Sequence, residues 1–313
     1  MSIPPDGQQD PVVGIDWGTT HRRVYLLNTD GDLIRLHSDE IGMLAAKGNF
    51  QNALADLLTL LQLERADVIM SGMVGSRNGW QEVPYLPVDH ALSRLPEALV
   101  DIRTALPNVR CRIVPGYQFI DAHGTPDVMR GEETQVLGAM AMRSFNGWFL
   151  LPGTHSKWVR IDHGRIEQIV TFMTGELFAL LSLHGTLAAL MQQQESSPTA
   201  FHAGIAAAWH GSFTHTAFSC RSLVVTDMMS AAHASSYLSG LLIGTELQDI
   251  RQKTQNQNQE SLQLIGAPAL AARYVDALEF VGMSALVWQP DEVYVAALRV
   301  LAGLKNLKSR DTS

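Results

Sequence analysis

The chain has 313 residues, with 23 Lys and Arg against 31 Asp and Glu, and a formal net charge of −8. Its composition is globular, 46% hydrophobic and 17% charged, and its length predicts two domains rather than one. An acidic chain lacks the basic surface that nucleic acids or anionic membranes attract, so we expect neither partner. Two cysteines without CxxC spacing exclude a disulfide framework and argue against a zinc site. Free thiols and an N-terminus without signal-peptide features predict a cytoplasmic protein.

Residues 12–36 predict three strands joined by two turns, at Gly18-Thr19-Thr20 and at Asp30-Gly31. Apolar spacing and turn residues predict the next elements, in chain order: a helix (50–64), a buried strand (66–72), a glycine-rich loop (71–90), a helix (91–105), a strand (110–114) and a helix from just after Asp127 to about Arg143.

A second copy of the first pattern begins near residue 147. The segment GWFLLPGTHSKWVRIDHGRIEQIV reads strand, Gly-Thr turn, strand, glycine turn, strand, and its Gly153-Thr154 falls on Gly18-Thr19. The hairpin glycines Gly31 and Gly164 match with a shift of two residues. One Gly-Thr match alone could arise by chance, but agreement over three strands and two turns favours a duplicated domain.

The rest of the second half is mainly helical. We expect helices over 174–191, 198–210, 231–253, 268–282 and 290–304, with a short strand over 262–266. The polar segment 252–261 is low in complexity and predicts an exposed loop.

A strand that ends in Asp-x-Gly-Thr-Thr and turns back is suited to phosphate binding. Gly18 lets backbone N–H groups approach phosphate oxygens, and the hydroxyls of Thr19 and Thr20 add further donors. Asp16, at the carboxyl end of the strand, is placed to hold Mg²⁺, directly or through water. A ligand-free hairpin is the alternative for one such turn. The second turn, Gly153-Thr154, favours two hairpins that clamp the β- and γ-phosphates of a nucleotide across a cleft.

Gly266 provides a third glycine element, between a short strand and a helix that begins with small residues. There it would let adenine or ribose approach the backbone, although a glycine at a helix start is also a plain capping feature. With the two turns, it points to a nucleotide whose phosphates are bound together with Mg²⁺.

Five longer segments carry a more specific signal. They are DWGTTHRR (16–23), SGMVGSRNGWQEVPYL (71–86), DVMRGEETQVLGA (127–139), LPGTHSKWV with TFMTGEL (151–159 and 171–177), and LSGLLIGTEL (238–247). Together they resemble the 2-dehydro-3-deoxygalactonokinase (2-oxo-3-deoxygalactonate kinase) family of the sugar kinase/hexokinase/Hsp70/actin superfamily, over about residues 12–304. The resemblance implies an α/β fold of two duplicated ribonuclease H-like, actin-like ATPase domains with a central cleft.

The resemblance also implies an enzyme, a sugar-acid kinase. It would use MgATP to phosphorylate the 6-hydroxyl of 2-dehydro-3-deoxy-D-galactonate in D-galactonate catabolism. We expect domain I (1–145) to carry the first phosphate hairpin and the sugar-acid site, and domain II (146–313) to carry the second hairpin and the adenosine site. A homodimer is the default oligomeric state. The alternatives are a kinase of another sugar or sugar acid and, in a different class, a non-catalytic actin-like nucleotide switch or sugar sensor.

Phosphoryl transfer to a hydroxyl needs a carboxylate that accepts the proton. Asp127 is the first candidate for this general base, because related sugar kinases carry an aspartate at a loop-to-helix junction; a helix N-cap is its structural alternative. Glu132 and Glu133 are the other candidates, and stabilising the helix dipole is their alternative role. Lys157 holds the place after the second turn that Arg22 holds after the first. It would neutralise charge on the transferred phosphoryl group or point outward from its strand.

The carboxylate of the sugar acid needs a cation. Arg77 is the first choice, in a loop that Gly75 would allow to wrap a small ligand, with a plain surface arginine as the alternative. Trp80 would shape the pocket or pack beneath it. Arg22 and Glu176 are further substrate-binding candidates, and helix capping is the alternative role of Glu176.

Overall fold

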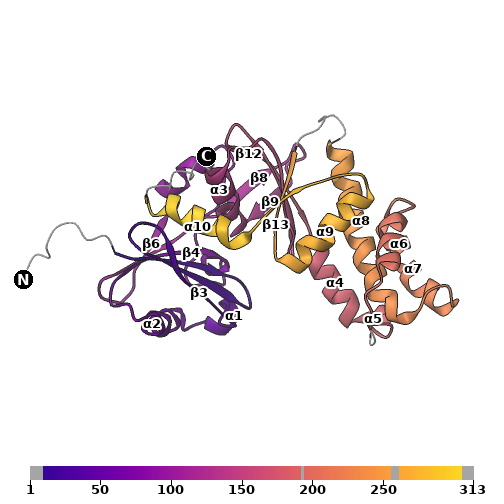
Figure 1. The fold of residues 1–313 in the computed structure, drawn as a ribbon, viewed down its shortest axis with the longest axis horizontal. Coiled ribbons are helices and arrows are strands. Elements are labelled where there is room, and N and C mark those ends of the chain that lie inside the picture. The colour runs from indigo at the N-terminus through magenta and orange to yellow at the C-terminus, as the bar shows by residue number, and fades with distance from the viewer. Residues whose placement is uncertain (1–9, 192–193, 255–260, 305–313) are drawn as a thin grey trace, which may run out of the picture. The chain divides into compact units, whose positions relative to one another are not determined.

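The computed structural model describes residues 10–191, 194–254 and 261–304, and the chain divides into two units (Figure 1). The first unit comprises residues 1–146, 160–169 and 289–313, and the second comprises residues 147–159 and 170–288. Most of the predicted low-complexity loop, residues 255–260, lies outside the described residues. No helix within the described ranges is both long and apolar enough to cross a membrane.

The first unit is built on a six-stranded sheet of order β3-β2-β1-β4-β7-β6. Its strands are β1 (Val12–Trp17), β2 (Arg22–Leu27), β3 (Leu33–Asp39), β4 (Ala66–Gly72), β6 (Val100–Ile102) and β7 (Val109–Ile113). β1, β2 and β3 form an antiparallel meander, β4 and β7 add in parallel, and β6 closes the edge antiparallel to β7. The carboxyl ends of β1 and β4 therefore meet at one edge of the sheet.

The described residues of this unit include the α-helices α1 (Met43–Ala46), α2 (Phe50–Leu61), α3 (Glu132–Met142) and α10 (Pro290–Leu301). α2 packs through Leu54 and Leu57 into the core cluster that contains Val13 and Ile15 of β1. Gly14 lies between them in sequence and faces α10, where an added Cβ would lie 2.1 Å from a Leu298 methyl carbon.

The last helix is a correction to the predicted domain II, which ran to residue 313. α10 packs against α3 so closely that a Cβ on Gly138 would lie 1.9 Å from the carbonyl oxygen of Val293. This backbone contact places residues 289–304 with the first unit, because the apolar face of α10 is buried there. The local pattern of α10 predicted the helix but carried no information about which sheet it covers.

A small sheet, β5-β8-β9, completes the first unit, with strands β5 (Leu86–Pro87), β8 (Tyr117–Ile120) and β9 (Pro126–Met129). The helix predicted over 91–105 was wrong: a short 3₁₀ helix covers Leu92–Ala98 with Pro96 inside it, and β6 follows. Proline lacks the N–H that an α-helix needs at this point. Asp127 also lies in β9 and not at a helix start, since α3 begins at Glu132 behind Gly131, whose φ is 110°.

The second unit repeats this sheet in the order β12-β11-β10-β13-β14. The strands of this sheet are β10 (Gly147–Leu151), β11 (Ser156–Asp162), β12 (Arg165–Phe172), β13 (Ser261–Ile265) and β14 (Leu286–Trp288), of which β10, β13 and β14 run in parallel. The end of β11 and the start of β12, within residues 160–169, are grouped with the first unit. The order matches β3-β2-β1-β4-β7 strand for strand, so the predicted duplication of a ribonuclease H-like, actin-like sheet is confirmed. The short β14 was not predicted.

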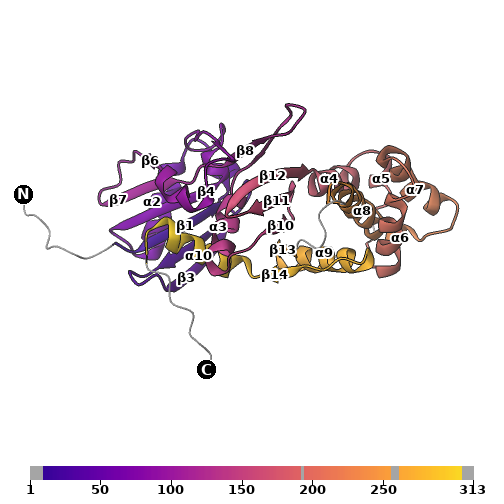
Figure 2. The same cartoon turned by 90° about the horizontal axis from the view of Figure 1, so that it is seen from above.

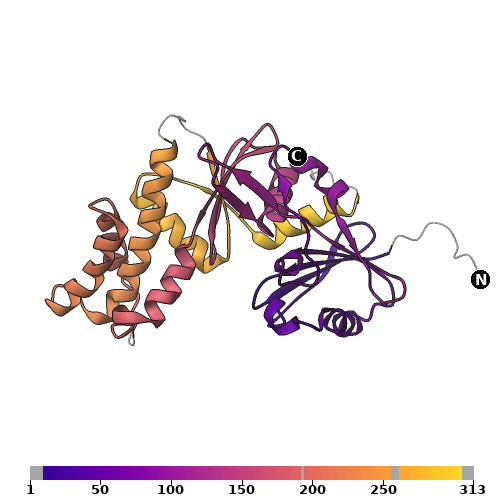
Figure 3. The ribbon, with the colours of Figure 1, turned by 180° about the vertical axis from the view of Figure 1, so that it is seen from behind.

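The helices of the second unit are α4 (Thr174–Leu183), α5 (Gly185–Ala188), α6 (Pro198–Ala208), α7 (Phe213–Val225), α8 (Ala234–Thr254) and α9 (Pro268–Phe280). The helix predicted over 174–191 breaks at Gly185, whose φ is 74°. α7 was missed because its apolar residues are spread around the helix and form no single face, and only Thr216 and Cys220 are buried. Figures 2 and 3 show α5, α6 and α7 gathered around α8. A Cβ on Gly240 would lie 1.9 Å from the Phe201 carbonyl oxygen, so α8 and α6 touch through their backbones.

Candidate active site

The first candidate phosphate turn, residues 18–21, joins β1 to β2. Gly18 is half-buried and Thr19 is exposed, at the end of two strands whose other side chains are mostly buried. Residues 41–44, which follow β3, form what we call the first brace. In it Met43 N–H donates to the Gly18 carbonyl at 2.9 Å, and Leu44 N–H donates to that of Thr19 at 3.1 Å. The turn therefore directs these carbonyl oxygens into the protein. This orientation suits anion binding at the outer side of the turn, because carbonyl oxygens that faced the anion would repel it.

Gly42 is the residue that allows the first brace to lie against the turn. A Cβ at this position would lie 2.3 Å from the carbonyl carbon of Thr20 and 2.6 Å from the nitrogen of His21. Both are backbone atoms, so no side-chain rotation could make room. The close approach requires glycine.

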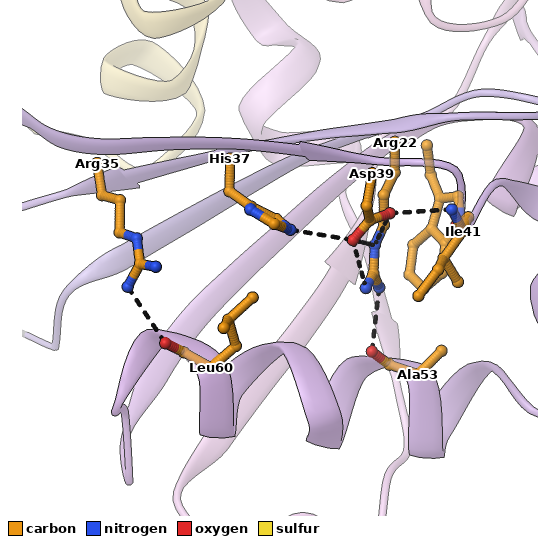
Figure 4. Close-up of polar contacts among 8 residues, drawn as sticks. Arg22, Arg35, His37, Asp39, Ile41, Ala53 and Leu60 are labelled. Atoms are coloured by element: carbon orange, nitrogen blue, oxygen red, sulfur yellow. Dashed lines mark hydrogen bonds and ion pairs between the residues drawn. The ribbon is translucent and has the colours of Figure 1, made fainter.

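The first brace is anchored by an ion pair between the buried Arg22 and the partly exposed Asp39 (Figure 4). The carboxylate of Asp39 accepts the N–H of Ile41 at 3.0 Å and bonds from the Nε and Nη2 of Arg22 at 2.9 and 3.0 Å. Burial would raise the pKa of Asp39, but the Arg22 and Ile41 bonds outweigh it and hold that pKa below its ordinary value. Arg22 Nη1 donates to the Ala53 carbonyl of α2, and its side chain is 2% exposed. This geometry argues against the predicted contact between Arg22 and substrate.

The second turn, residues 152–155, joins β10 to β11 and is built in the same way. Its brace is residues 173–176, after β12. The N–H of Glu176 donates to the Thr154 carbonyl at 2.9 Å. A Cβ on Gly175 would lie 2.4 Å from the carbonyl oxygen of Gly153, again a backbone atom. Each turn is therefore supported by a glycine that follows the third strand of its sheet.

The braces extend the internal repeat beyond what the sequence analysis recognised. Gly42 follows the hairpin glycine Gly31 by the same number of residues as Gly175 follows Gly164. The matching spacing was the signal that could have identified both glycines. It was missed because the two segments, IGML and TGEL, share little else.

Other predicted residues lie close to the second turn. Lys157 is buried, and its Nζ donates to the Thr171 hydroxyl at 2.7 Å, so it does not point outward into solvent. The carboxylate of Glu176 lies 2.6 Å from the Nε2 of His155. Gly266 packs beside the same turn, where its Cβ would lie 2.9 Å from a ring carbon of Pro152.

Asp16 lies at the carboxyl end of β1 with its side chain 22% exposed. Burial raises its pKa, Arg23 at 3.8 Å lowers it, and Asp291 at the start of α10 raises it again. No group of three or more His, Cys, Asp or Glu among the described residues could hold a metal by itself. Mg²⁺ in phosphate-transferring sites is usually held by one or two carboxylates, waters and the substrate phosphates, so Asp16 fits that role.

The start of α3 lies at the same strand edge as Asp16. An added Cβ on Gly131 would lie 3.2 Å from the Cα of Gly72, and one on Gly72 would lie 3.6 Å from the Oδ1 of Asp16. Glu132 accepts the N–H of Arg130 at 2.9 Å. Two of the three candidate bases, Glu132 and its neighbour Glu133, are therefore at this edge.

Glu133 and Asp127 have different surroundings. Glu133 is fully buried and accepts the N–H of Gly131 at 2.7 Å, and burial together with the Glu132 charge raises its pKa to about 8. Asp127 lies in β9, opposite Phe119, where its carboxylate accepts the N–H of Val128. It is not the helix cap that the sequence suggested as an alternative.

The loop after β4 carries the predicted sugar-acid residues. Arg77 is exposed, whereas Gly75 is buried, and its Cβ would lie 2.9 Å from the Nη1 of Arg130. Arg130 was not predicted; its guanidinium lies over the Tyr85 ring at 4.3 Å and donates to the Val83 carbonyl. These contacts fix the loop from inside.

Trp80, at the end of the same loop, stacks on Phe50 at 6.0 Å between ring centroids. It also lines a cavity of 380 Å³ together with Gly79 and residues 48–52. Trp80 thus packs on the core and forms a wall of this cavity, and its contact with a sugar acid stays a prediction.

A family model described as 2-keto-3-deoxy-galactonokinase matches residues 16–301. The chain belongs to this family. The 2-dehydro-3-deoxygalactonokinase of Escherichia coli (strain K12) is 33% identical over 292 residues, which are 93% of this chain and 97% of that protein. The crystal structure of a Sinorhizobium meliloti protein with the same family name is 31% identical, with a TM-score of 0.86 over 96% of this chain and 99% of that one.

A more distant structure shares only the fold. Component A of the (R)-2-hydroxyglutaryl-CoA dehydratase of Acidaminococcus fermentans has a TM-score of 0.50 at 10% identity, covering 94% of this chain and 97% of that one. The predicted family and actin-like fold class are confirmed. The protein is an enzyme, a sugar-acid kinase, and ATP is the phosphate donor that such a kinase implies.

Within this 2-keto-3-deoxy-galactonokinase, the sequence motifs located the turns but not their supports. Four supporting residues were missed: Asp39 and Gly42 in the first unit, and Thr174 and Gly175 in the second. The motif TFMTGEL contained the last two, but nothing in it indicated that Gly175 lies against the backbone of Gly153 and Thr154, or that Thr174 donates to the buried Glu246.

Proposed function

We propose that this kinase transfers the γ-phosphoryl group of MgATP to the 6-hydroxyl of 2-dehydro-3-deoxy-D-galactonate. The family match over residues 16–301 is the observation that carries the substrate assignment. The two braced Gly-Thr turns support the phosphate chemistry, because each presents glycine and threonine at a strand end with its carbonyls turned away. A kinase for another sugar acid on the same fold is the alternative.

The turns at residues 18–21 and 152–155 bind phosphate oxygens through backbone N–H groups and the hydroxyls of Thr19, Thr20 and Thr154. Gly266 supports an adenosine site in the second unit, because it lies beside Pro152 of the turn. Buried Lys157 adds positive charge from β11, directly behind the turn. Exposed side chains on rigid strand ends are suited to this role, since phosphoryl transfer depends mainly on positioning and charge neutralisation.

Asp16 holds Mg²⁺ through water in this proposal. The ion, when bound with the nucleotide, neutralises phosphate charge. Burial and the nearby Asp291 both disfavour the charged form of Asp16 and so raise its pKa. A bound cation would offset both effects, which supports this assignment.

We assign the proton-accepting role to Glu132 in preference to Asp127. Glu132 begins α3 directly behind Gly131, which lies against Gly72 at the strand edge of Asp16. Asp127 lies in β9, away from the helix start that motivated its choice. Glu133, with a pKa of about 8, is protonated at neutral pH and fits the role of a base less well.

The sugar-acid carboxylate is assigned to Arg77, the exposed guanidinium of the loop after β4, with Trp80 as an apolar wall. A guanidinium grips a carboxylate through two parallel bonds, which orients a small acid as well as binding it. Glu176 stays a candidate for a substrate hydroxyl, although His155 already contacts its carboxylate. The homodimer stays a prediction.

A coupled ADP-release assay with a panel of 2-oxo-3-deoxy sugar acids tests the function. Turnover should be highest with the galacto compound, and no turnover with any member would overturn the proposal. In the same assay Glu132→Gln should lower kcat by about 100-fold, the usual contribution of a general base, and Asp127→Asn should change it much less. The reverse order would move the base to Asp127.

A further inference from the structure

A buried carboxylate in the second unit receives four side-chain hydrogen bonds. Glu246, on α8, is 1% exposed. Its Oε1 accepts bonds from the hydroxyl of Ser156 at 2.7 Å and the indole N–H of Trp158 at 2.6 Å. Its Oε2 accepts bonds from the hydroxyls of Thr174 at 2.5 Å and Tyr274 at 2.8 Å. All four acceptor sites of the carboxylate are therefore used.

The four donors come from three elements that surround the second phosphate turn. Ser156 is the first residue of β11, directly after residues 152–155, and Trp158 follows on the same face of that strand. Thr174 is the first residue of α4 and belongs to the second brace. Tyr274 lies on α9, the helix that follows Gly266. One carboxylate thus ties together the exit of the turn and its brace.

The bond from Thr174 is the one that reaches the turn most directly. Thr174 precedes Gly175, whose backbone lies against the Gly153 carbonyl, and Glu176, whose N–H bonds to Thr154. A shift of Thr174 by a few tenths of an ångström would be passed to Gly153 and Thr154 through these backbone contacts, because there is no side chain between them to absorb it.

We propose that Glu246 is a positioning residue for phosphoryl transfer: through Thr174 it fixes the brace that holds the Gly153-Thr154 turn in its phosphate-binding geometry. The proposal rests on the proposed phosphate-binding role of this turn. Glu246 belongs to the LSGLLIGTEL segment. In this proposal it does not contact a substrate, and it affects ATP binding through the turn.

A matched pair of variants separates positioning from general stability. Thr174→Val and Tyr274→Phe each remove one hydroxyl donor from the same oxygen, Oε2 of Glu246, and each keeps nearly the same side-chain shape. Thr174 belongs to the brace and Tyr274 does not. We therefore expect similar losses of thermal stability from both, but different effects on the nucleotide.

The prediction for Thr174→Val is a roughly tenfold rise in the ATP KM, because the displaced turn would lose the equivalent of one hydrogen bond to a charged phosphate, with the sugar-acid KM unchanged. Tyr274→Phe should leave the ATP KM within about twofold, and Thr174→Ser, which restores the hydroxyl, should recover most of the loss. Equal ATP KM values for Thr174→Val and Tyr274→Phe would show that Glu246 serves stability alone.

Calorimetric binding of a non-hydrolysable ATP analogue with Mg²⁺ gives a second readout that needs no turnover. Wild type should bind the analogue, and Thr174→Val should bind it about tenfold more weakly than Tyr274→Phe. Absence of sugar-acid turnover in an enzyme that binds the analogue would contradict the substrate assignment and leave this proposal standing. Should Thr174→Val fail to fold, Thr174→Ala replaces it, because it also removes the hydroxyl and adds no bulk to the site. An unchanged affinity in Thr174→Ala would overturn the proposal.

Discussion

The two Gly-Thr turns have the same backbone support and opposite side-chain anchors. In the first unit the anchor is an ion pair on neighbouring strands, Arg22 with Asp39, and the Arg22 guanidinium reaches α2. In the second unit the charge is on the helix: Glu246 of α8 accepts bonds from neutral donors on β11 and α4. α2 and α8 each precede the fourth strand of their sheet, so the two anchors join equivalent elements.

This difference shows which part of the repeat is under geometric constraint. The braces have kept a glycine at the same spacing because backbone lies against backbone, and no other residue fits. The anchors have diverged because several side-chain arrangements can fix a brace. The first anchor is partly open, with Asp39 20% exposed, whereas the second is sealed, with Glu246 1% exposed.

Substitution of the two brace glycines should have the largest effect, because it removes the support that the two turns share. Gly42→Ala and Gly175→Ala should each lower kcat/KM by about 100-fold or more, because the new Cβ would displace a phosphate turn by the ångström or so that costs this much in catalysis. Gly211→Ala is the control, since its Cβ would meet only side-chain atoms at 3.6 Å. Steady-state kinetics on the three variants measures the effect on kcat/KM. Equal kcat/KM values for Gly42→Ala and Gly211→Ala would show that the brace does not position the turn.

The first anchor can be broken without touching a turn. Arg22→Met should destabilise the protein by about 2 to 4 kcal/mol, because it leaves the Asp39 carboxylate without its cation and the Ala53 carbonyl without its donor. Arg35→Met is the matched control: Arg35 is exposed and makes one bond, to the Leu60 carbonyl at 3.2 Å (Figure 4), so it should cost less than about 0.5 kcal/mol. Urea denaturation measures both, and similar losses would contradict the anchor.

The smallest effect concerns the other fully buried carboxyl, Glu133. Its pKa is raised to about 8 in the folded state, so its contribution to stability is complete below pH 4.5 and is lost as the pH rises through 8. Glu133→Gln, which cannot ionise, should reduce the fall in stability between pH 6 and 8 by about 2 kcal/mol. Denaturation midpoints across this range test the shift, and parallel curves for the two proteins would show that Glu133 ionises like an ordinary glutamate.

The local sequence predicted most of the strands of both sheets. In each sheet a Gly-Thr turn and a glycine hairpin turn separate segments in which apolar and polar residues alternate. The local sequence could not predict that α10 returns to the first unit, since its packing on Gly138 is a long-range contact without a local signal. It also misplaced Asp127, because β9 is short and Pro126 begins it. Arg22 is the first residue of β2 and Lys157 the second residue of β11, so the predicted match is shifted by one residue. Their burial could not be predicted from the residue type, because charged side chains are usually exposed.

The central claim is that both Gly-Thr turns bind the phosphates of ATP. Amide hydrogen exchange in peptides covering residues 18–21 and 152–155, with and without Mg²⁺ and a non-hydrolysable ATP analogue, measures this directly. The account predicts that the analogue slows exchange in both turns, because their N–H groups become hydrogen-bonded to phosphate oxygens. Analogue binding that leaves exchange unchanged in either turn would contradict it.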